Sequence, residues 1–236
     1  ISDARLIWGG DKTINTLKTF KTNERNLDIT FADRYSFCVI DQSKLLKLNK
    51  FELRNLVQKF YNDTFLVDQN ACSSPHLIVW TGKKHKKAKE VFWKELYNLV
   101  KLKYNLTESA PSEKFNDLCK HIITTKNRES IKTYENFIYK IRLRKLSKEN
   151  DTYRGKWGFF FEYETKDINK IKDFINNKYQ TLTYFGVDKN KLKNFIFDNN
   201  LKGIDRIVPI GQSLNIGLSW DGYDIPNMLS RGVEVQ

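Results

Sequence analysis

The sequence has few of the residues that build metal sites and disulfide frameworks. Its 236 residues include three cysteines, Cys38, Cys72 and Cys119, and three histidines. They form no CxxC or HExxH pattern, so we expect no structural or catalytic zinc site. Thiols without disulfide spacing are typical of reducing compartments, and we therefore expect an intracellular, cytoplasmic protein.

Long apolar runs are also missing. No stretch of about 18 apolar residues occurs, so no membrane span is expected. The chain starts at Ile1 instead of Met, and no signal-peptide pattern precedes its first apolar segment. We therefore expect a fragment or a processed product. With 40% hydrophobic and 14% aromatic residues, one large domain, or one domain and a piece of another, can bury a sizeable core.

Acidic residues are outnumbered, with 28 Asp and Glu against 41 Lys and Arg, for a net charge of +13. This excess fits nucleic acid, anionic cofactors or acidic partner proteins, but a general bias towards lysine also explains it. The basic run 82–89 is either a solvated helix face or a contact to an acidic carrier protein or to CoA phosphates. A nucleic-acid-binding module is a distant alternative, because no aromatic side chains are interleaved as stacking platforms.

Hydrophobic periodicity predicts alternating strands and helices along the chain. The predicted strands are residues 4–8, 27–31, 36–40, 77–80, 157–163, 180–185 and 205–210. The predicted helices are residues 12–19, 45–60, 82–100, 112–122 with Ser112 as N-cap and Phe115 facing inward, 128–146, 167–175 and 189–197. Such alternation is typical of an α/β fold, and we predict a three-layer αβα architecture with a mostly parallel sheet.

Two turns are candidate sites. Gly9-Gly10-Asp11 lies between a strand and a helix, as in phosphate-binding α/β units, but it lacks the full GxGxxG pattern and a plain tight turn explains it equally well. The second turn, residues 68–75, places Cys72 among small and amide residues before a strand. A thiol there has room for a substrate, and Asn70 and backbone N–H groups could stabilise an oxyanion. Cys38 and Cys119 lie on apolar stripes and are expected in the core.

Four segments in order carry a resemblance to a known family. They are Leu6 to Asp11, Asp68 to Cys72, Gln180 to Leu182, and Gly203 to Val208. Together they resemble the LuxC-type acyl-CoA reductases, a branch of the aldehyde dehydrogenase superfamily, and the match covers the C-terminal half of such an enzyme. The resemblance implies an aldehyde-dehydrogenase-like catalytic domain at 41–210, the tail end of a Rossmann-like cofactor domain at 1–40, and a packing or subunit-contact segment at 211–236.

The resemblance also implies an activity. It is the NADPH-dependent reduction of a fatty acyl thioester to an aldehyde, with Cys72 as acyl-accepting nucleophile and Gly9 and Gly10 in a cofactor-binding loop. The acyl donor would be CoA or a carrier protein, an acyltransferase or acyl-protein synthetase is a possible partner, and an oligomer is expected. No nucleic acid is implied.

One difference from the oxidising aldehyde dehydrogenases indicates whether reduction or oxidation is expected. Oxidising aldehyde dehydrogenases carry a glutamate that activates water against the thioester, and Thr30 stands at the matching place here. A reductase must keep its acyl-enzyme until hydride arrives, so this replacement favours reduction over an oxidising aldehyde dehydrogenase, the nearer alternative. Glu162 and Glu164 do not identify the glutamate that usually holds the nicotinamide ribose. His76 is either functional or a packed or surface residue.

Overall fold

The computed structural model describes residues 2–83 and 85–236, which form two compact units. One unit joins the first 34 residues to residues 215–236, and the other comprises residues 35–214. Each is described by itself. The assignment of residues 1–40, 41–210 and 211–236 to cofactor, catalytic and packing roles stays a prediction. Among the described residues, no helix is long and apolar enough to cross a membrane.

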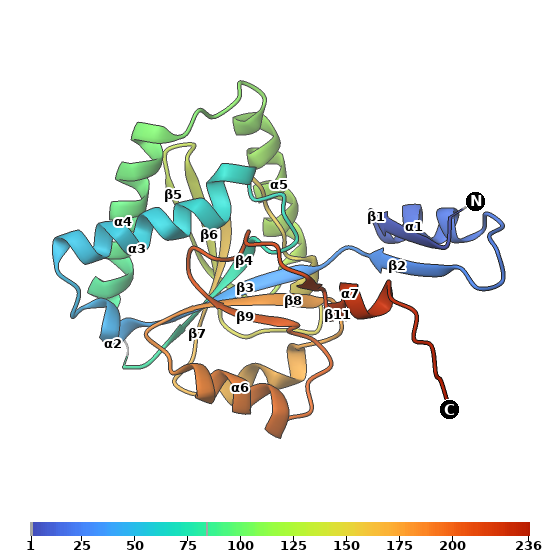
Figure 1. Ribbon diagram of the computed structural model, residues 1–236. Helices are drawn as coiled ribbons and strands as arrows, with labels where there is room; N and C mark the ends of the chain where they lie inside the picture. The colour runs from blue at the N-terminus through green and yellow to red at the C-terminus, as the bar shows by residue number, and fades with distance from the viewer. Residues whose placement is uncertain (1, 84) are drawn as a thin grey trace. The chain divides into compact units, whose positions relative to one another are not determined.

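The larger unit is built on a seven-stranded sheet in the order β5-β6-β7-β4-β3-β8-β9 (Figure 1). Its strands are β3 (Tyr35–Asp41), β4 (Pro75–Thr81), β5 (Arg128–Tyr134), β6 (Ile138–Leu143), β7 (Phe159–Glu164), β8 (Tyr179–Phe185) and β9 (Arg206–Pro209). All neighbours pair in parallel except β5 and β6, which form an antiparallel hairpin. The predicted mostly parallel sheet is confirmed.

Both faces of the central strands are buried, as expected for a parallel sheet with helices on either side. Along β3, Phe37 and Val39 join one core cluster, whereas Cys38 and Ile40 join the other. This period of two sorts each strand's side chains between two layers of helices. Helices α3 and α4 cover one face, and α6 with the 3-10 helix η3 covers the other (Figure 1). The three-layer αβα architecture is therefore confirmed.

The helical elements of this unit differ in length. They are α2 (Gln42–Leu45), α3 (Lys50–Thr64), η1 (Phe65–Val67), α4 (Lys86–Lys103), α5 (Ala110–Thr124), η2 (Asn150–Thr152), η3 (Ile168–Phe174) and α6 (Lys189–Asp198). The helices predicted at 82–100 and 189–197 correspond to α4 and α6. Part of the first prediction, Lys84, lies outside the described residues.

The smaller unit contains a parallel strand pair, β1 (Ala4–Trp8) and β2 (Leu27–Phe31), joined by helix α1 (Asp11–Lys18). The C-terminal residues add β10 (Ser219–Trp220), β11 (Tyr223–Asp224) and α7 (Ile225–Met228). Trp220 is buried in one cluster with Ile29 and Phe31. The strand–helix–strand order predicted from the sequence is confirmed.

The helix predicted at 128–146 is wrong, because this segment is the β5–β6 hairpin. Both strands contain β-branched and aromatic residues, which suit a sheet. β5 is mostly exposed, whereas β6 is buried on both faces. The chain reverses between them at Glu135, whose φ is 46°. The abundance of basic residues, which are good helix formers, favoured the helix prediction.

The N-terminal prediction for α5 is also wrong. Ser109, not Ser112, is its N-cap, and Phe115 is 56% exposed instead of facing inward. Leu118 is buried as expected. The segment predicted as a helix at 167–175 is the 3-10 helix η3.

The helix predicted at 45–60 starts too early, because α2 ends at Leu45 and α3 starts only at Lys50. The break between them is a new helix start. Asn49 accepts a hydrogen bond from the Glu52 N–H at 3.0 Å, and the Glu52 carboxylate accepts one from the Asn49 N–H at 2.9 Å. This reciprocal capping box satisfies two N–H groups that a helix start otherwise leaves unpaired.

Replacing the cap residue should destabilise the fold modestly. We expect Asn49→Ala to lower the free energy of unfolding by about 1 kcal/mol, because it removes the acceptor of the first turn. Urea unfolding measures the effect. The matched control is Asn55→Ala at an exposed position within the same helix, which should be neutral or slightly stabilising. If both variants lost the same free energy of unfolding, Asn49 would have no capping role.

Candidate active site

The cysteine turn lies between η1 and the start of β4. Its first two residues, Asp68 and Gln69, have φ of 52° and 61°. This left-handed conformation is uncommon for residues other than glycine and needs support from its surroundings. The Tyr104 hydroxyl donates a hydrogen bond to the Asp68 carboxylate. The Trp157 N–H donates to the Asp68 carbonyl at 3.1 Å.

Gln69 is the hydrogen-bonding centre of the turn. It is 1% exposed, and its Nε2 donates to the carbonyls of Pro75 and Phe159, each at 3.0 Å. Its Oε1 accepts from the N–H groups of Gly158 and Phe159 at 3.1 and 3.0 Å. One amide therefore closes the turn on itself, from residue 69 to residue 75, and ties it to the start of β7.

Removing this amide should cost stability. We expect Gln69→Leu to lower the free energy of unfolding by about 2–4 kcal/mol, because four buried backbone groups lose their partner. Thermal or urea unfolding checks the value. Gln58→Leu on α3, where the side chain bonds to Asn62 and Lys103 at the helix surface, is the control and should change stability by no more than about 0.5 kcal/mol. A Gln69→Leu variant as stable as wild type would contradict this account.

Cys72 itself is held through its backbone. The Ser74 N–H donates to the Ala71 carbonyl at 2.9 Å, which closes a tight turn around the cysteine. The Ser36 hydroxyl donates to the Cys72 carbonyl at 2.7 Å and accepts from the Thr181 N–H at 3.1 Å. The amino ends of β3, β4 and β8 thus meet at the cysteine. Cys72 is a half-buried residue, and its thiol is in no disulfide.

Asn70 follows Gln69 and is exposed. It lines a cavity of about 180 Å³ together with His76, Arg154 and Lys156. The structure therefore brings Asn70 and Cys72 into one turn, with one residue, Ala71, between them. The role of the Asn70 amide as an oxyanion donor stays a prediction.

His76 is packed in the interior, with 4% exposure and its ring stacked on Tyr35 at 5.6 Å. Burial, followed by the nearby Arg154 charge, lowers the pKa of His76 to about 3, whereas a bond to the Gly155 backbone opposes that shift. The imidazole is therefore neutral at physiological pH. These facts favour the packed alternative for His76.

The other two cysteines differ in their surroundings. Cys38 is fully buried on β3, as predicted, and burial raises the pKa of its thiol. Cys119 is half-buried on α5, so it is less enclosed than the prediction of a core residue implied. Among the described residues, no three His, Cys, Asp or Glu side chains are grouped closely enough to hold a metal ion.

Glu162 and Glu164 lie at the carboxyl end of β7 and are bound within the fold. Glu162 pairs with Lys140 at 3.1 Å. Glu164 pairs with Lys89 at 2.9 Å and with Arg142 at 2.8 Å. These contacts explain both carboxylates as parts of a buried ion network. Lys89, one of the cations of the basic run 82–89, is therefore held in an ion pair within the fold.

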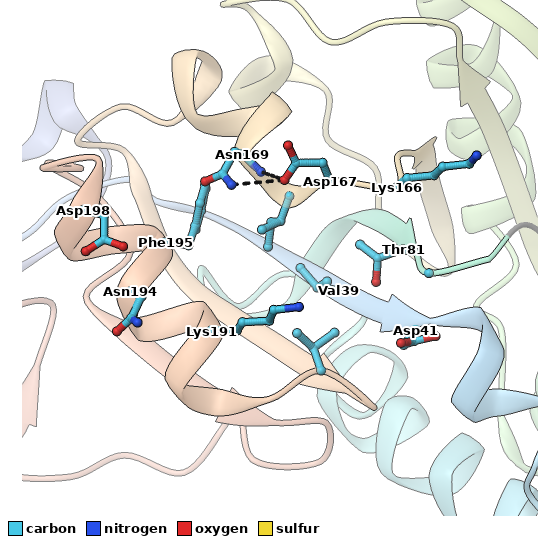
Figure 2. A pocket seen from close by; sticks show the side chains of 13 residues that line it. Val39, Asp41, Thr81, Lys166, Asp167, Asn169, Lys191, Asn194, Phe195 and Asp198 are labelled. Atoms are coloured by element: carbon cyan, nitrogen blue, oxygen red, sulfur yellow. Dashed lines mark hydrogen bonds between the residues drawn. The ribbon is translucent and has the colours of Figure 1, made fainter.

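A larger cavity, of about 410 Å³, lies at the carboxyl ends of β3 and β4 (Figure 2). Asp41 and Thr81 stand at its edge, and Lys191 extends from α6 towards Val39. Ligands of parallel α/β sheets commonly bind at this edge. The cysteine turn lies at the other end of β4, about 20 Å away along seven residues of strand. We place the candidate site at the cysteine, because the thiol and its fixed backbone are there.

The predicted cofactor loop lies in the smaller unit. The Gly9 N–H donates to the Phe31 carbonyl at 3.2 Å, so it is already bonded. Gly10 is exposed, and a Cβ built there meets no atom within 4 Å. It is the N-cap of α1 and has no side-chain cap bond, while Asp11 places a carboxylate in the first turn. The turn therefore offers an anionic cofactor one contact, at the open helix start at Gly10.

The sequence matches the family described as acyl-CoA reductase (LuxC) over residues 1–139. The chain belongs to this family. No curated protein sequence matches the chain. The matched range includes the strand–helix–strand segment of the smaller unit and the cysteine turn.

Solved structures that superpose on this chain include several aldehyde dehydrogenases. Aldehyde dehydrogenase 21 from Physcomitrella patens superposes with a TM-score of 0.60 at 12% identity, covering 96% of this chain and 50% of that chain. Methylmalonate-semialdehyde dehydrogenase from Oceanimonas doudoroffii gives 0.58 at 10% identity, with 92% and 47% coverage. An NAD-dependent benzaldehyde dehydrogenase from Corynebacterium glutamicum gives 0.54 at 10% identity, with 89% and 46%. The LuxC-family chain thus has an aldehyde dehydrogenase fold and spans about half the length of these proteins.

Proposed function

We propose that the full-length enzyme containing this chain reduces a fatty acyl thioester to an aldehyde, with Cys72 as the nucleophile. The observation that carries the proposal is a LuxC-family chain in which a half-buried thiol is fixed where three parallel strands begin. A nucleophile needs access for its substrate and a backbone that keeps it in place. The half-burial of Cys72 and the backbone bonds of its turn support this role.

The first chemical step uses residues of this chain. The Cys72 thiolate attacks the thioester carbonyl and forms a tetrahedral oxyanion. The Cys72 N–H, with the Asn70 amide as a second candidate donor, would stabilise that charge by roughly 3–4 kcal/mol per donor. The leaving thiolate, CoA or a carrier thiol, departs and is protonated, and the acyl group remains on sulfur. His76 takes no part as a base, because its pKa is far below physiological pH.

A bound nicotinamide cofactor, which we propose to be NADPH, would supply the hydride that converts the S-acyl group to aldehyde. Gly10 at the open start of α1 would contribute a backbone contact to it, and Gly9 would shape the turn. Thr30, in place of a hydrolytic glutamate, supports reduction, since the thioester then has no side-chain base there to direct water against it. We further propose that the protein works in the cytoplasm as an oligomer. An acyltransferase or acyl-protein synthetase would be its partner.

The direct test is mass spectrometry of full-length enzyme incubated with an acyl-CoA. We expect one acyl group on the peptide that contains Cys72, and its conversion to free aldehyde after NADPH is added. Release of free acid instead would favour an oxidising aldehyde dehydrogenase, the second candidate. Acylation of Cys38 or Cys119 alone would overturn the assignment of the nucleophile.

The nucleic-acid alternative has less support. The ammonium of Lys89 is bound to Glu164 inside the fold, and Lys86 lies 4.0 Å from Glu90 on the same helix. A true nucleic-acid module would bind with a steep salt dependence. A binding assay at two salt concentrations, run beside the acylation assay, separates the two functions.

A further inference from the structure

Lys114 is a buried lysine that the proposed reaction does not use. It lies on α5 and is 1% exposed. Its Nζ donates to the carbonyls of Asn136 and Phe137, both at 2.8 Å, and to the carbonyl of Trp157 at 2.6 Å. An ammonium group has three N–H donors. All three are therefore used by backbone carbonyls of two separate segments.

Burial of the Lys114 ammonium costs free energy. A buried ammonium loses its hydration, and burial lowers the pKa of Lys114 to about 7. The contacts that offset the loss are carbonyl dipoles and the face of the Tyr139 ring, 4.7 Å from Nζ. A leucine at this position would fill the interior without that cost, so packing alone does not account for the lysine.

The two segments that Lys114 joins are the β5–β6 turn and the residues just before β7. We call residues 157–159, which include the first residue of β7, the strap. On one side, the Trp157 carbonyl accepts from Lys114. On the other, the Trp157 N–H donates to the Asp68 carbonyl, and the N–H groups of Gly158 and Phe159 donate to Gln69. The strap thus connects Lys114 to the first two residues of the cysteine turn.

The strap also has little freedom to adjust. Trp157 and Gly158 both have positive φ, 53° and 83°. A Cβ built on Gly158 would lie 2.5 Å from the Phe137 carbonyl oxygen, so the strap and the β5–β6 turn are in close contact. A backbone held in this conformation depends on its hydrogen bonds. Loss of the ammonium would remove one of the contacts that hold the strap, which is itself bonded to Asp68 and Gln69.

We propose that Lys114 is a positioning residue for Cys72, acting through the strap on the turn that carries the nucleophile. The inference rests on the proposed function, since it concerns the geometry of acyl transfer at Cys72. It assigns Lys114 no contact with the substrate. Lys114 would hold in place the turn that carries the candidate oxyanion donors, the Cys72 N–H and the Asn70 amide.

The test compares two reactions of Cys72 in full-length enzyme. Acylation by an acyl-CoA requires the thiol and the oxyanion donors in register, whereas alkylation by iodoacetamide requires only an accessible thiol. Peptide mass spectrometry gives both rates, with alkylation of Cys119 as an internal reference. We expect Lys114→Met to lower the ratio of acylation to alkylation at Cys72 by about 10–100-fold, because small misplacements of a reacting group have effects of that size. Lys114→Arg, which restores donors, should recover part of the ratio.

The matched control is Lys120→Met, at an exposed lysine on the same helix that pairs with Asp117 at 3.4 Å. Its ratio should equal that of wild type. An unchanged ratio in Lys114→Met, even with a lower melting temperature, would show a purely structural lysine and overturn the proposal. Failure of wild-type enzyme to acylate at Cys72 would instead overturn the proposed function.

A measurement on unmodified enzyme covers the case in which Lys114→Met does not fold. Native-state hydrogen exchange reports the free energy at which each segment opens. If the strap holds the turn, the amides of Trp157, Gly158 and Phe159 should open together with those of residues 68–70, at one shared free energy. Independent opening of the strap at a lower free energy than the turn would contradict the proposal.

Discussion

Full-length enzyme carrying Cys72→Ala is expected to form no acyl adduct and to produce aldehyde at least about 10⁴-fold more slowly than wild type. The reason is chemical, since alanine has no group that can displace the thiol of the donor. The fold should persist, because Cys72 is half-buried and its hydrogen bond to Ser36 uses the backbone carbonyl. Mass spectrometry after incubation with an acyl-CoA, with aldehyde measured in parallel, checks both parts.

The other cysteines supply the controls for this experiment. Cys119→Ala removes a half-buried thiol on α5 and should keep acylation near the wild-type rate. Cys38→Ala removes a buried sulfur and should lower stability but not the acylated fraction of folded enzyme. An adduct that persists in Cys72→Ala would place the nucleophile elsewhere.

Much of the fold was predictable because the strands of the sheet bury both faces. Segments such as 36–40 and 77–80 are short apolar runs between turn residues, and each proved to be the centre of a strand. The position of Cys72 in a polar turn before β4 followed from the same pattern. The β5–β6 hairpin escaped prediction because β5 is an edge strand with mostly exposed residues. Its sequence therefore has no apolar stripe to reveal the period.

The supports of the candidate site could not be predicted. Gln69 and Phe159 are 90 residues apart, and Lys114 reaches Trp157 across 43 residues. Such bonds exist only after the sheet has brought the segments together, and no local period or spacing marks their side chains. Gln69 stood in a turn already rich in polar residues, and Lys114 stood on a helix among other charged residues. The nucleophile could be inferred locally, whereas its positioning is a property of the tertiary structure.

The cysteine can lie at the amino edge of the sheet because several elements of the tertiary structure hold its turn there. The amino ends of β3, β4 and β8 meet there, and Ser36 bonds to both Cys72 and Thr181. The strap adds a fourth element from β7. A turn with this many independent attachments needs no ligand to order it. We therefore expect the turn to have the same conformation before and after acylation.

The protein should lose stability in mild acid through His76. Burial lowers the folded-state pKa of this imidazole from 6.5 to about 3. Between those values the unfolded chain binds a proton that the folded protein does not, so stability is fully present above pH 6.5 and is lost as the pH falls towards 3. The full loss is about 4–5 kcal/mol, and about 3 kcal/mol of it should occur between pH 7 and pH 4. Free energies of unfolding from urea titrations over this range measure it.

A variant isolates the contribution of this one group. His76→Phe keeps a ring against Tyr35 but cannot bind a proton, so its stability should fall less steeply between pH 7 and pH 4. The difference between the two curves removes the contributions of carboxylates and of His121, whose pKa is also lowered by burial. His85→Gln, at a half-buried helix start, is the matched control and should keep the wild-type slope. Parallel curves for wild type and His76→Phe would mean that His76 binds its proton without unfolding, and that the interior around Tyr35 and Arg154 admits a charge.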